Sequence, residues 1–77
     1  MATSNQAHHT VVALYLGAEV AIGEGESYEY AMRECLEAIP AMYPSDDVVL
    51  DCTNSAMPWV RVSMPLELAR EAFPVEA

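Results

Sequence analysis

Residues 27–40, SYEYAMRECLEAIP, carry the clearest periodic pattern in the chain. Apolar side chains recur there at i, i+3, i+4 and i+7, which is the spacing of one face of an α-helix. Ser27 suits the N-cap position, and Pro40, which has no amide hydrogen, is expected to end the helix near Ile39. The apolar positions are Tyr28, Ala31, Met32, Cys35, Leu36 and Ile39. The pattern predicts one amphipathic helix with this face against a core.

Four short strands are predicted around this helix. Residues 10–16, TVVALYL, are rich in β-branched and aromatic residues and stop at Gly17, and residues 19–23 make a shorter second strand. Residues 48–52 and 59–64 are the predicted third and fourth strands. Because strands joined by short connections usually pair, we expect an antiparallel sheet with helices on one face. The predicted fold class is α+β, a small sheet of about four strands in the order ββαββα.

The connection between the first two strands has two interpretations. Gly17-Ala18 suits a tight two-residue turn with glycine first. A three-residue connection is favoured because register follows the face that buries more apolar surface. That connection would place these side chains together on the buried face: Val12, Leu14, Leu16, Val20 and Ile22.

The last part of the chain predicts an alternating strand followed by a short helix. The strand would point Val60, Val62 and Met64 inward, and Trp59, Arg61 and Ser63 outward. The sequence leaves two alternatives for Trp59, which could lie in the core or in an interface with a partner.

Pro65 suits the first position of a helix over residues 65–72, which Pro74 would end. Its expected apolar contacts are Leu66, Leu68 or Ala69, and Phe73. Residues 1–8 are polar and aperiodic, so we expect a flexible tail followed by a single domain over residues 9–77.

This 77-residue chain has twelve acidic residues, three arginines and no lysine, and its formal net charge is -9. Such a surface attracts cationic partners and repels nucleic acid, although acidity can also serve solubility alone. The 53% of hydrophobic residues argues against disorder. A core this small is thin, and oligomerisation is a common remedy, so a homodimer is one expectation.

The composition also bears on location. No apolar run reaches the ~20 residues that a membrane span needs, and residues 1–9 do not resemble a signal peptide. The two cysteines are too few for a secreted disulfide scaffold. We therefore expect a cytoplasmic protein with reduced thiols and no membrane partner.

Catalytic, cofactor and metal sites are not predicted. A catalytic base belongs on a rigid element, and His8 and His9 fall in the predicted tail or at the edge of the first strand. Cys35 and Cys52 are isolated rather than paired at metal-ligand spacing. Residues 23–26, GEGE, lack the ending of a phosphate-binding loop. An enzyme is therefore the least favoured interpretation.

The acids are grouped rather than evenly spread. Residues four apart on a helix rise about 6 Å, close to the spacing of successive phosphates in a nucleic-acid strand. Carboxylates at this spacing could occupy a basic groove built for DNA or RNA, and an ordinary solvated helix face is the alternative. The expected partner-binding residues are Glu24, Glu26, Glu29, Glu37, Asp46 and Asp47, with Tyr30 and Arg33 adding contacts.

In size, charge and layout the chain resembles small acidic phage-encoded anti-CRISPR proteins. The hairpin, one amphipathic helix and a second β pair ending in VRVSMPLELA (residues 60–69) are similar to those of some inhibitors of type I CRISPR surveillance complexes. The resemblance implies a non-enzymatic inhibitor, located in the host bacterial cell, that binds Cas subunits and blocks target DNA. It carries no shared motif, so it assigns no residue a role.

A second resemblance supports a different partner. The hairpin followed by GESYEYAMRECLEAI (residues 25–39) is similar to the sheet-then-helix start of HicB-like antitoxin domains. This resemblance implies a regulatory module that neutralises a bacterial toxin or enzyme. Such domains usually carry or pair with a DNA-binding segment, and no basic segment of that kind occurs in this chain.

Overall fold

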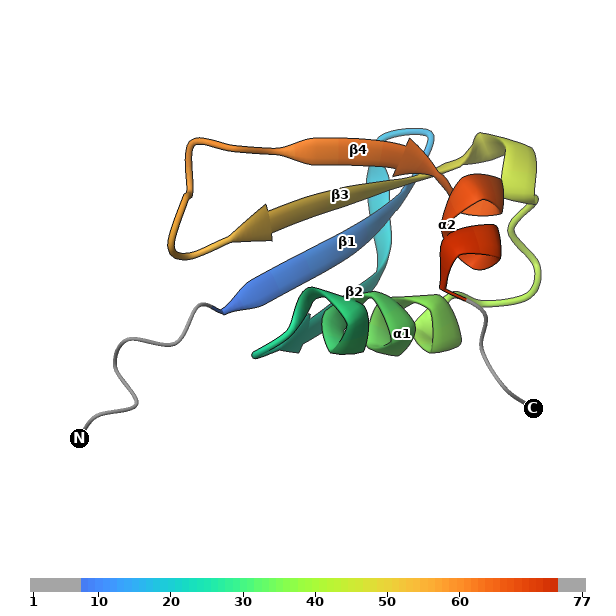
Figure 1. The fold of residues 1–77 in the computed structure, drawn as a ribbon. Helices are drawn as coiled ribbons and strands as arrows, with labels where there is room; N and C mark the ends of the chain where they lie inside the picture. Colours follow the sequence, from blue (N-terminus) through green and yellow to red (C-terminus); the bar gives the residue numbers. More distant parts are fainter. Residues whose placement is uncertain (1–7, 74–77) are drawn as a thin grey trace.

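The computed structural model describes residues 8–73 and contains a four-stranded sheet, two α-helices and one 3-10 helix (Figure 1). The order along the chain confirms the predicted α+β class and the ββαββα arrangement. The elements are β1 (His9–Tyr15), β2 (Ala18–Gly25), α1 (Tyr28–Ala38), η2 (Ser45–Asp47), β3 (Val48–Asn54), β4 (Val62–Pro65) and α2 (Leu66–Ala72).

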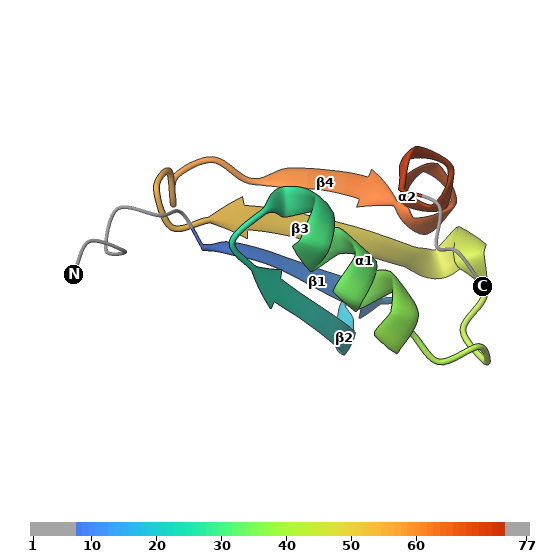
Figure 2. The same ribbon diagram turned by 60° about the horizontal axis from the view of Figure 1, so that its bottom comes forward.

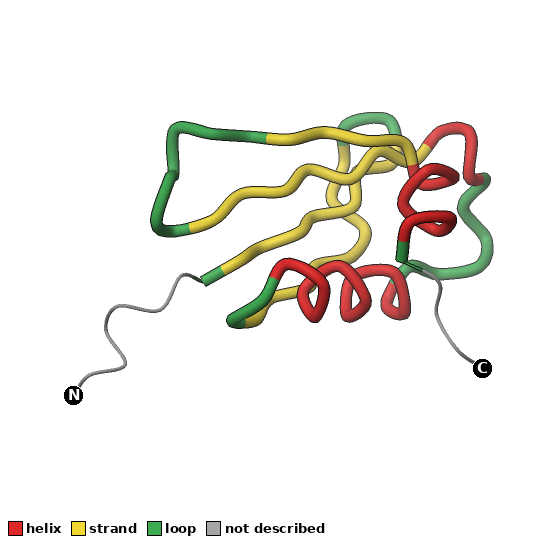
Figure 3. Tube along the Cα trace, viewed as in Figure 1, coloured by secondary structure: helices red, strands yellow, loops and turns green. Residues whose placement is uncertain are grey.

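The sheet is antiparallel with the strand order β2-β1-β3-β4, so β1 and β3 are central (Figure 3). The helix α1 packs on β1 and β2, and α2 packs beside β3, β4 and η2. In Figure 2, α1 lies in front of the sheet. Residues of both helices belong to the same buried cluster as β1 and β3, so the two helices cover the same face of the sheet.

The predicted helix is confirmed in its limits and in its buried face. The hydroxyl oxygen of Ser27, the N-cap, accepts a hydrogen bond of 3.0 Å from the backbone nitrogen of Tyr30. The apolar positions Ala31, Met32, Cys35, Leu36 and Ile39 are buried, and Tyr28 is half-buried. Local spacing alone therefore determined which side of α1 meets the sheet.

The hairpin differs from both predicted connections. Tyr15 pairs with Ala18, so the turn residues are Leu16 and Gly17, with φ values of 51° and 90°. Two positive φ values in sequence are typical of a type I′ turn, whose twist matches that of the flanking strands. The pairing then shifts by one residue between Ala13 and Leu14.

The predicted buried face of the hairpin was wrong for four of its five side chains, and only Val20 packs against the core. Ile22 pairs with Val12, whereas the favoured register would have paired it with Leu14, and both Val12 and Ile22 lie on the face of the sheet opposite the helices. The core instead takes Val11, Ala13 and Ala21. The reason is steric: Ala13, Ala21 and Gly23 have little or no side-chain volume on this face, and Gly23 lies directly against the backbone of α1.

The fourth strand is shorter than predicted. Trp59, Val60 and Arg61 precede it in a loop, where Val60 is exposed. Val62 pairs with Cys52 and Met64 with Leu50, so both lie on the face toward the helices as predicted, although Val62 is exposed and Met64 only half-buried. Local turns hold this loop, because Asn54 Oδ1 accepts hydrogen bonds from the backbone nitrogens of the second and third residues after it.

The final helix begins one residue later than predicted, because Pro65 ends β4 and stands at the N-cap of α2. Leu66 and Ala69 are buried and Phe73 is half-buried, whereas Leu68 is exposed. Of the two alternatives for the middle contact, the structure selects Ala69.

The predicted flexible tail and the predicted end of the last helix lie near the two ends of the chain. Residues 1–7 and 74–77, including the expected stop at Pro74, lie outside the described residues. His8, assigned to the tail, donates from its backbone nitrogen to Ser55 Oγ at 2.8 Å, and its carbonyl accepts from the Ser55 nitrogen at 2.9 Å. Within residues 8–73, neither helix has the length and apolar character required to cross a membrane.

Candidate functional site

The outward face of α1 carries a row of charges. Glu29, Arg33 and Glu37 are spaced four residues apart and are all exposed. Glu29 Oε2 lies 3.0 Å from Arg33 Nη2, four residues further along the helix. An exposed pair of this kind contributes only a few tenths of a kcal/mol to helix stability. The row therefore does little for the fold.

Two further predicted residues lie with this row. Tyr30 is 57% exposed although it is a large aromatic residue, and its ring lies against Gly25. Glu26 lies just before the N-cap and is exposed. Glu34, also exposed, continues the charge beside Arg33. We define the α1 acidic face as Glu26, Glu29, Tyr30, Arg33, Glu34 and Glu37.

The other three predicted residues lie elsewhere. Glu24 alternates with Gly23, which faces α1, so its side chain lies on the opposite side of β2. Its Oε1 is 3.1 Å from Nε2 of His8. Asp46 and Asp47 belong to η2, which packs beside α2 and β4 (Figure 1). These aspartates do not extend the row on α1.

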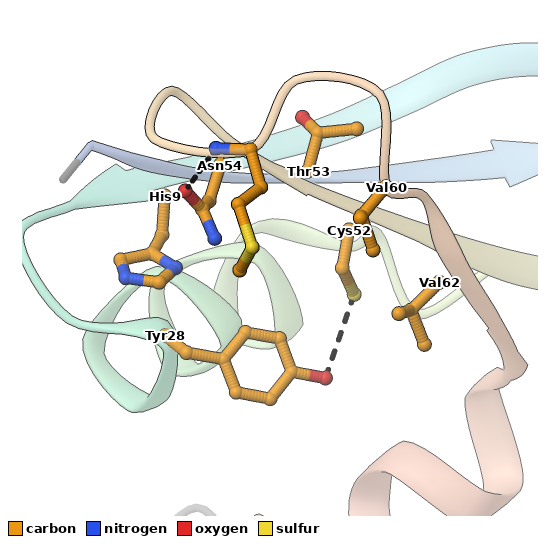
Figure 4. A pocket seen from close by; sticks show the side chains of 8 residues that line it. His9, Tyr28, Cys52, Thr53, Asn54, Val60 and Val62 are labelled. Carbon is orange, nitrogen blue, oxygen red and sulfur yellow. Dashed lines mark hydrogen bonds between the residues drawn. The ribbon is translucent and has the colours of Figure 1, made fainter.

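A pocket of about 390 Å³ lies where the start of β1, the start of α1, the end of β3 and the loop after it meet (Figure 4). Its lining is mostly apolar. The lining residues are His9, Tyr28, Cys52, Thr53, Asn54, Met57, Val60 and Val62. The sequence did not reveal this site, because its side chains come from β1, α1, β3, β4 and the loop between β3 and β4 and share no motif.

Tyr28 is the central side chain of this pocket. Its hydroxyl lies 3.6 Å from Cys52 Sγ, in a hydrogen bond in which either group can donate (Figure 4). Its ring centre lies 6.2 Å from that of His9 and 5.3 Å from that of Phe73, which meets it edge-on. These contacts hold the ring between β1 and the end of α2.

The ionisation of the pocket does not favour acid–base or nucleophilic chemistry. Burial, together with the hydrogen bond to Cys52, raises the pKa of Tyr28 well above its ordinary value. Burial also raises the pKa of Cys52, with its hydrogen bond to Tyr28 acting in the opposite direction. Because the thiolate is the nucleophilic form of cysteine, a thiol that stays protonated at neutral pH is suited to packing rather than reaction.

Metal-ligating side chains do not gather in the part of the chain that the structure describes. No group of three or more His, Cys, Asp or Glu residues between His8 and Phe73 is arranged to hold a metal ion. Cys35 and Cys52 are both free and buried.

Trp59 lies on the surface beside the pocket. It is 77% exposed, so of the two places considered from the sequence the core is excluded. It stands between Met57 and Val60, two exposed residues that also line the pocket. Large aromatic residues in such positions often anchor protein interfaces.

Comparison of the chain with protein-family models, with curated proteins and with solved structures finds no match.

Proposed function

We propose that this protein is a non-enzymatic inhibitor that binds a basic, nucleic-acid-handling protein complex through the α1 acidic face. The most concrete case is an anti-CRISPR protein that blocks target DNA binding by a type I CRISPR surveillance complex in the host cytoplasm. Its partners would be Cas subunits rather than nucleic acid or a membrane.

The observation that carries the proposal is the outward row Glu29, Arg33 and Glu37, bordered by Glu26 and Glu34. Four of these five side chains are acidic, and Glu29 lies 3.0 Å from the one arginine among them, Arg33. The row follows a rigid helix whose rise of about 6 Å per four residues is comparable to phosphate spacing. Arg33 occupies the middle step of the row, so the carboxylates of Glu29 and Glu37 lie two steps, about 12 Å, apart along the helix. Glu26 and Glu34 flank them, and together these four acids would face a groove lined with lysine and arginine.

Charge reversal tests the proposal. The variant with Glu26, Glu29 and Glu37 all changed to Lys has a formal charge of -3, since each reversal adds two to -9. Binding to a purified type I surveillance complex, and its inhibition of target DNA binding in a gel-shift assay, should fall at least about tenfold, because each lost charge contact is worth about 1 kcal/mol or more in a desolvated interface.

The matched control reverses three acids elsewhere. Glu19, Glu67 and Glu71 are exposed and lie outside α1, and their reversal gives the same formal charge of -3. The control should retain most of the binding. Equal loss in both variants would indicate a general charge effect rather than a specific face, and binding that is unchanged between low and high salt would contradict the electrostatic basis.

A second function, an antitoxin-like module that neutralises a bacterial toxin or enzyme, is favoured by a different surface. Met57, Trp59 and Val60 form an exposed apolar group at the pocket. The affinity of a partner bound by these side chains would depend little on salt. The substitution Trp59→Ala would abolish that binding. The two functions therefore differ in which variant abolishes binding.

A further inference from the structure

The pocket beside Tyr28 has the size of a small-molecule site. Its volume of about 390 Å³ lies within the range of about 300–1,000 Å³ that is typical of ligand pockets. An apolar cavity of about 150 Å³ already accommodates benzene. The space beside Tyr28 therefore suits a compound of two fused rings rather than one ring.

Hydrogen bonds hold the walls of this pocket in place. The loop after β3 is fastened to the start of β1, because the Ser55 backbone nitrogen donates to the His8 carbonyl at 2.9 Å. Further along the loop, the Val60 nitrogen donates to the Met57 carbonyl at 3.0 Å. On the other side, the Tyr28 ring is held by Phe73 and Cys52. Because the walls are already ordered, a ligand would bind without the entropic cost of arranging them.

Asn54 provides a polar group at a fixed place in these apolar walls. Its Oδ1 accepts hydrogen bonds from the backbone nitrogens of Ala56 at 2.7 Å and Met57 at 3.2 Å. A backbone N–H needs an acceptor, so these two bonds determine which end of the amide is the oxygen. The amide nitrogen lies at the other end, and Figure 4 shows it directed into the pocket, toward the side where His9 and Tyr28 lie. The pocket thus presents an N–H donor.

The lining favours an uncharged ligand. Among the described residues that line the pocket, none is Asp, Glu, Lys or Arg. Burial raises the pKa of Tyr28 and of Cys52, so both stay uncharged at neutral pH. A charged ligand would lose its water without meeting a carboxylate, an ammonium or a guanidinium group in the pocket. The net charge of -9 disfavours an anion further.

We propose that this pocket binds an uncharged aromatic compound of two fused rings that carries a hydrogen-bond acceptor, to which the amide nitrogen of Asn54 donates. The rings of His9 and Tyr28 and the thioether of Met57 are the lining groups that favour an aromatic ligand. The proposal does not depend on the function of the α1 acidic face, because none of the residues of that face lines the pocket.

Titration of ¹⁵N-labelled protein with coumarin, followed by two-dimensional NMR, tests the proposal. Coumarin is an uncharged compound of two fused rings with a carbonyl acceptor. With about eleven non-hydrogen atoms it should bind with a dissociation constant below about 1 mM. The backbone signals of the pocket residues and the side-chain amide signal of Asn54 should shift, and those of the α1 acidic face should not. Coumarin-3-carboxylate, which adds a negative charge, should bind at least about fivefold more weakly.

The variant Asn54→Asp separates the hydrogen bond from the apolar contacts. Aspartate keeps an oxygen that can accept from the backbone nitrogens of Ala56 and Met57 but has no amide hydrogens. The affinity for coumarin should fall at least about fivefold, whereas the affinity for naphthalene, which has no acceptor, should change less than about twofold. In the unchanged protein, coumarin should also shift the side-chain amide signal of Asn54 more than naphthalene does.

The variant Val62→Trp tests the place of binding. Val62 is an exposed lining residue, and an indole group there would fill the pocket, so both compounds should lose at least about tenfold in affinity. The matched control is Leu68→Trp, on an exposed position of α2 that is outside the lining, and it should bind like the unchanged protein. The dispersion of the NMR signals shows whether each variant is folded.

Four outcomes would overturn the proposal. The absence of shifts up to about 2 mM coumarin would leave the pocket to a side chain of a protein partner. Shifts that persist in Val62→Trp would place the binding elsewhere. Equal shifts of the Asn54 amide signal with coumarin and naphthalene, in the unchanged protein, would remove Asn54 as the donor even if Asn54→Asp did not fold. Binding of the carboxylate as tight as that of coumarin would contradict the preference for an uncharged ligand.

Discussion

Gly23 on β2 lies against the backbone of Cys35 on α1, so closely that a Cβ atom at Gly23 would overlap the Cys35 amide nitrogen. The same atom would overlap the carbonyl oxygen of Ala31. Backbone atoms within a helix cannot move aside as a flexible side chain can. The absence of a side chain at Gly23 therefore sets the distance between α1 and the sheet.

Gly23→Ala is expected to lower the free energy of unfolding by about 3 kcal/mol, at the upper end of overpacking effects, because α1 must shift as a unit. The control is Gly25→Ala, where the nearest atoms belong to the exposed ring of Tyr30, which can rotate away. Its cost should stay below about 1 kcal/mol. Urea denaturation measures both, and equal costs would contradict the role assigned to the helix backbone.

Leu16 offers a stabilising change, because its φ of 51° is unfavourable for a residue with a branched side chain. It is 74% exposed, so its replacement removes little packing. Leu16→Asn should raise the free energy of unfolding by about 1 kcal/mol, since asparagine is favoured in type I′ turns. Leu16→Ala retains the backbone strain and should give no such gain. Thermal melting measures the stability of both variants. An equal rise in melting temperature for Leu16→Ala and Leu16→Asn would contradict this account.

The buried thiol of Cys35 should make the free energy of unfolding depend on pH in the alkaline range. Burial in the core, with a smaller contribution from Cys52, raises the pKa of its thiol from 9.0 to about 11. Below about pH 9 the thiol is protonated in both folded and unfolded chains and adds no pH dependence. Between pH 9 and 11 only the unfolded chain releases this proton, so stability falls as pH rises, by up to about 2–3 kcal/mol.

The comparison that isolates this effect is Cys35→Ala, measured by urea denaturation under reducing conditions from pH 7 to 10.5. The variant should be less stable at pH 7 but should lose less stability between pH 9 and 10.5. Tyr28 and Cys52, whose pKa values are also raised, act in the same direction in both proteins. Parallel curves for the two proteins would show that Cys35 does not cause the decline.

Local sequence predicted α1 well because the pattern is set within one element. The spacing of Ala31, Met32, Cys35 and Leu36 places them on one side of any helix, whatever that helix meets. Ser27 acts on a backbone amide only three residues away. The ion pair between Glu29 and Arg33 is local in the same way, since residues four apart on a helix are neighbours.

The faces of the hairpin could not be predicted in this way. β1 offers two apolar faces, and the larger side chains, Val12 and Leu14, made the wrong face more attractive by area. The deciding fact is the fit of α1 onto Gly23, which is a contact between elements. Likewise, Asp46 and Asp47 were grouped with the acids of α1 by charge, but the packing of η2 beside α2 and β4 places them elsewhere.

The sequence by itself determined the element order, the buried side of α1 and the acidic character of its outer side, because each depends on composition and on spacing within one segment. Tertiary structure alone decided which face of the sheet stays open, where Trp59 lies and that His9, Tyr28 and Cys52 line one pocket. These features depend on contacts between residues distant in sequence. The periodicity of apolar residues does not predict these contacts. It describes the directions of side chains around one helix or strand and not the distance from that element to another element.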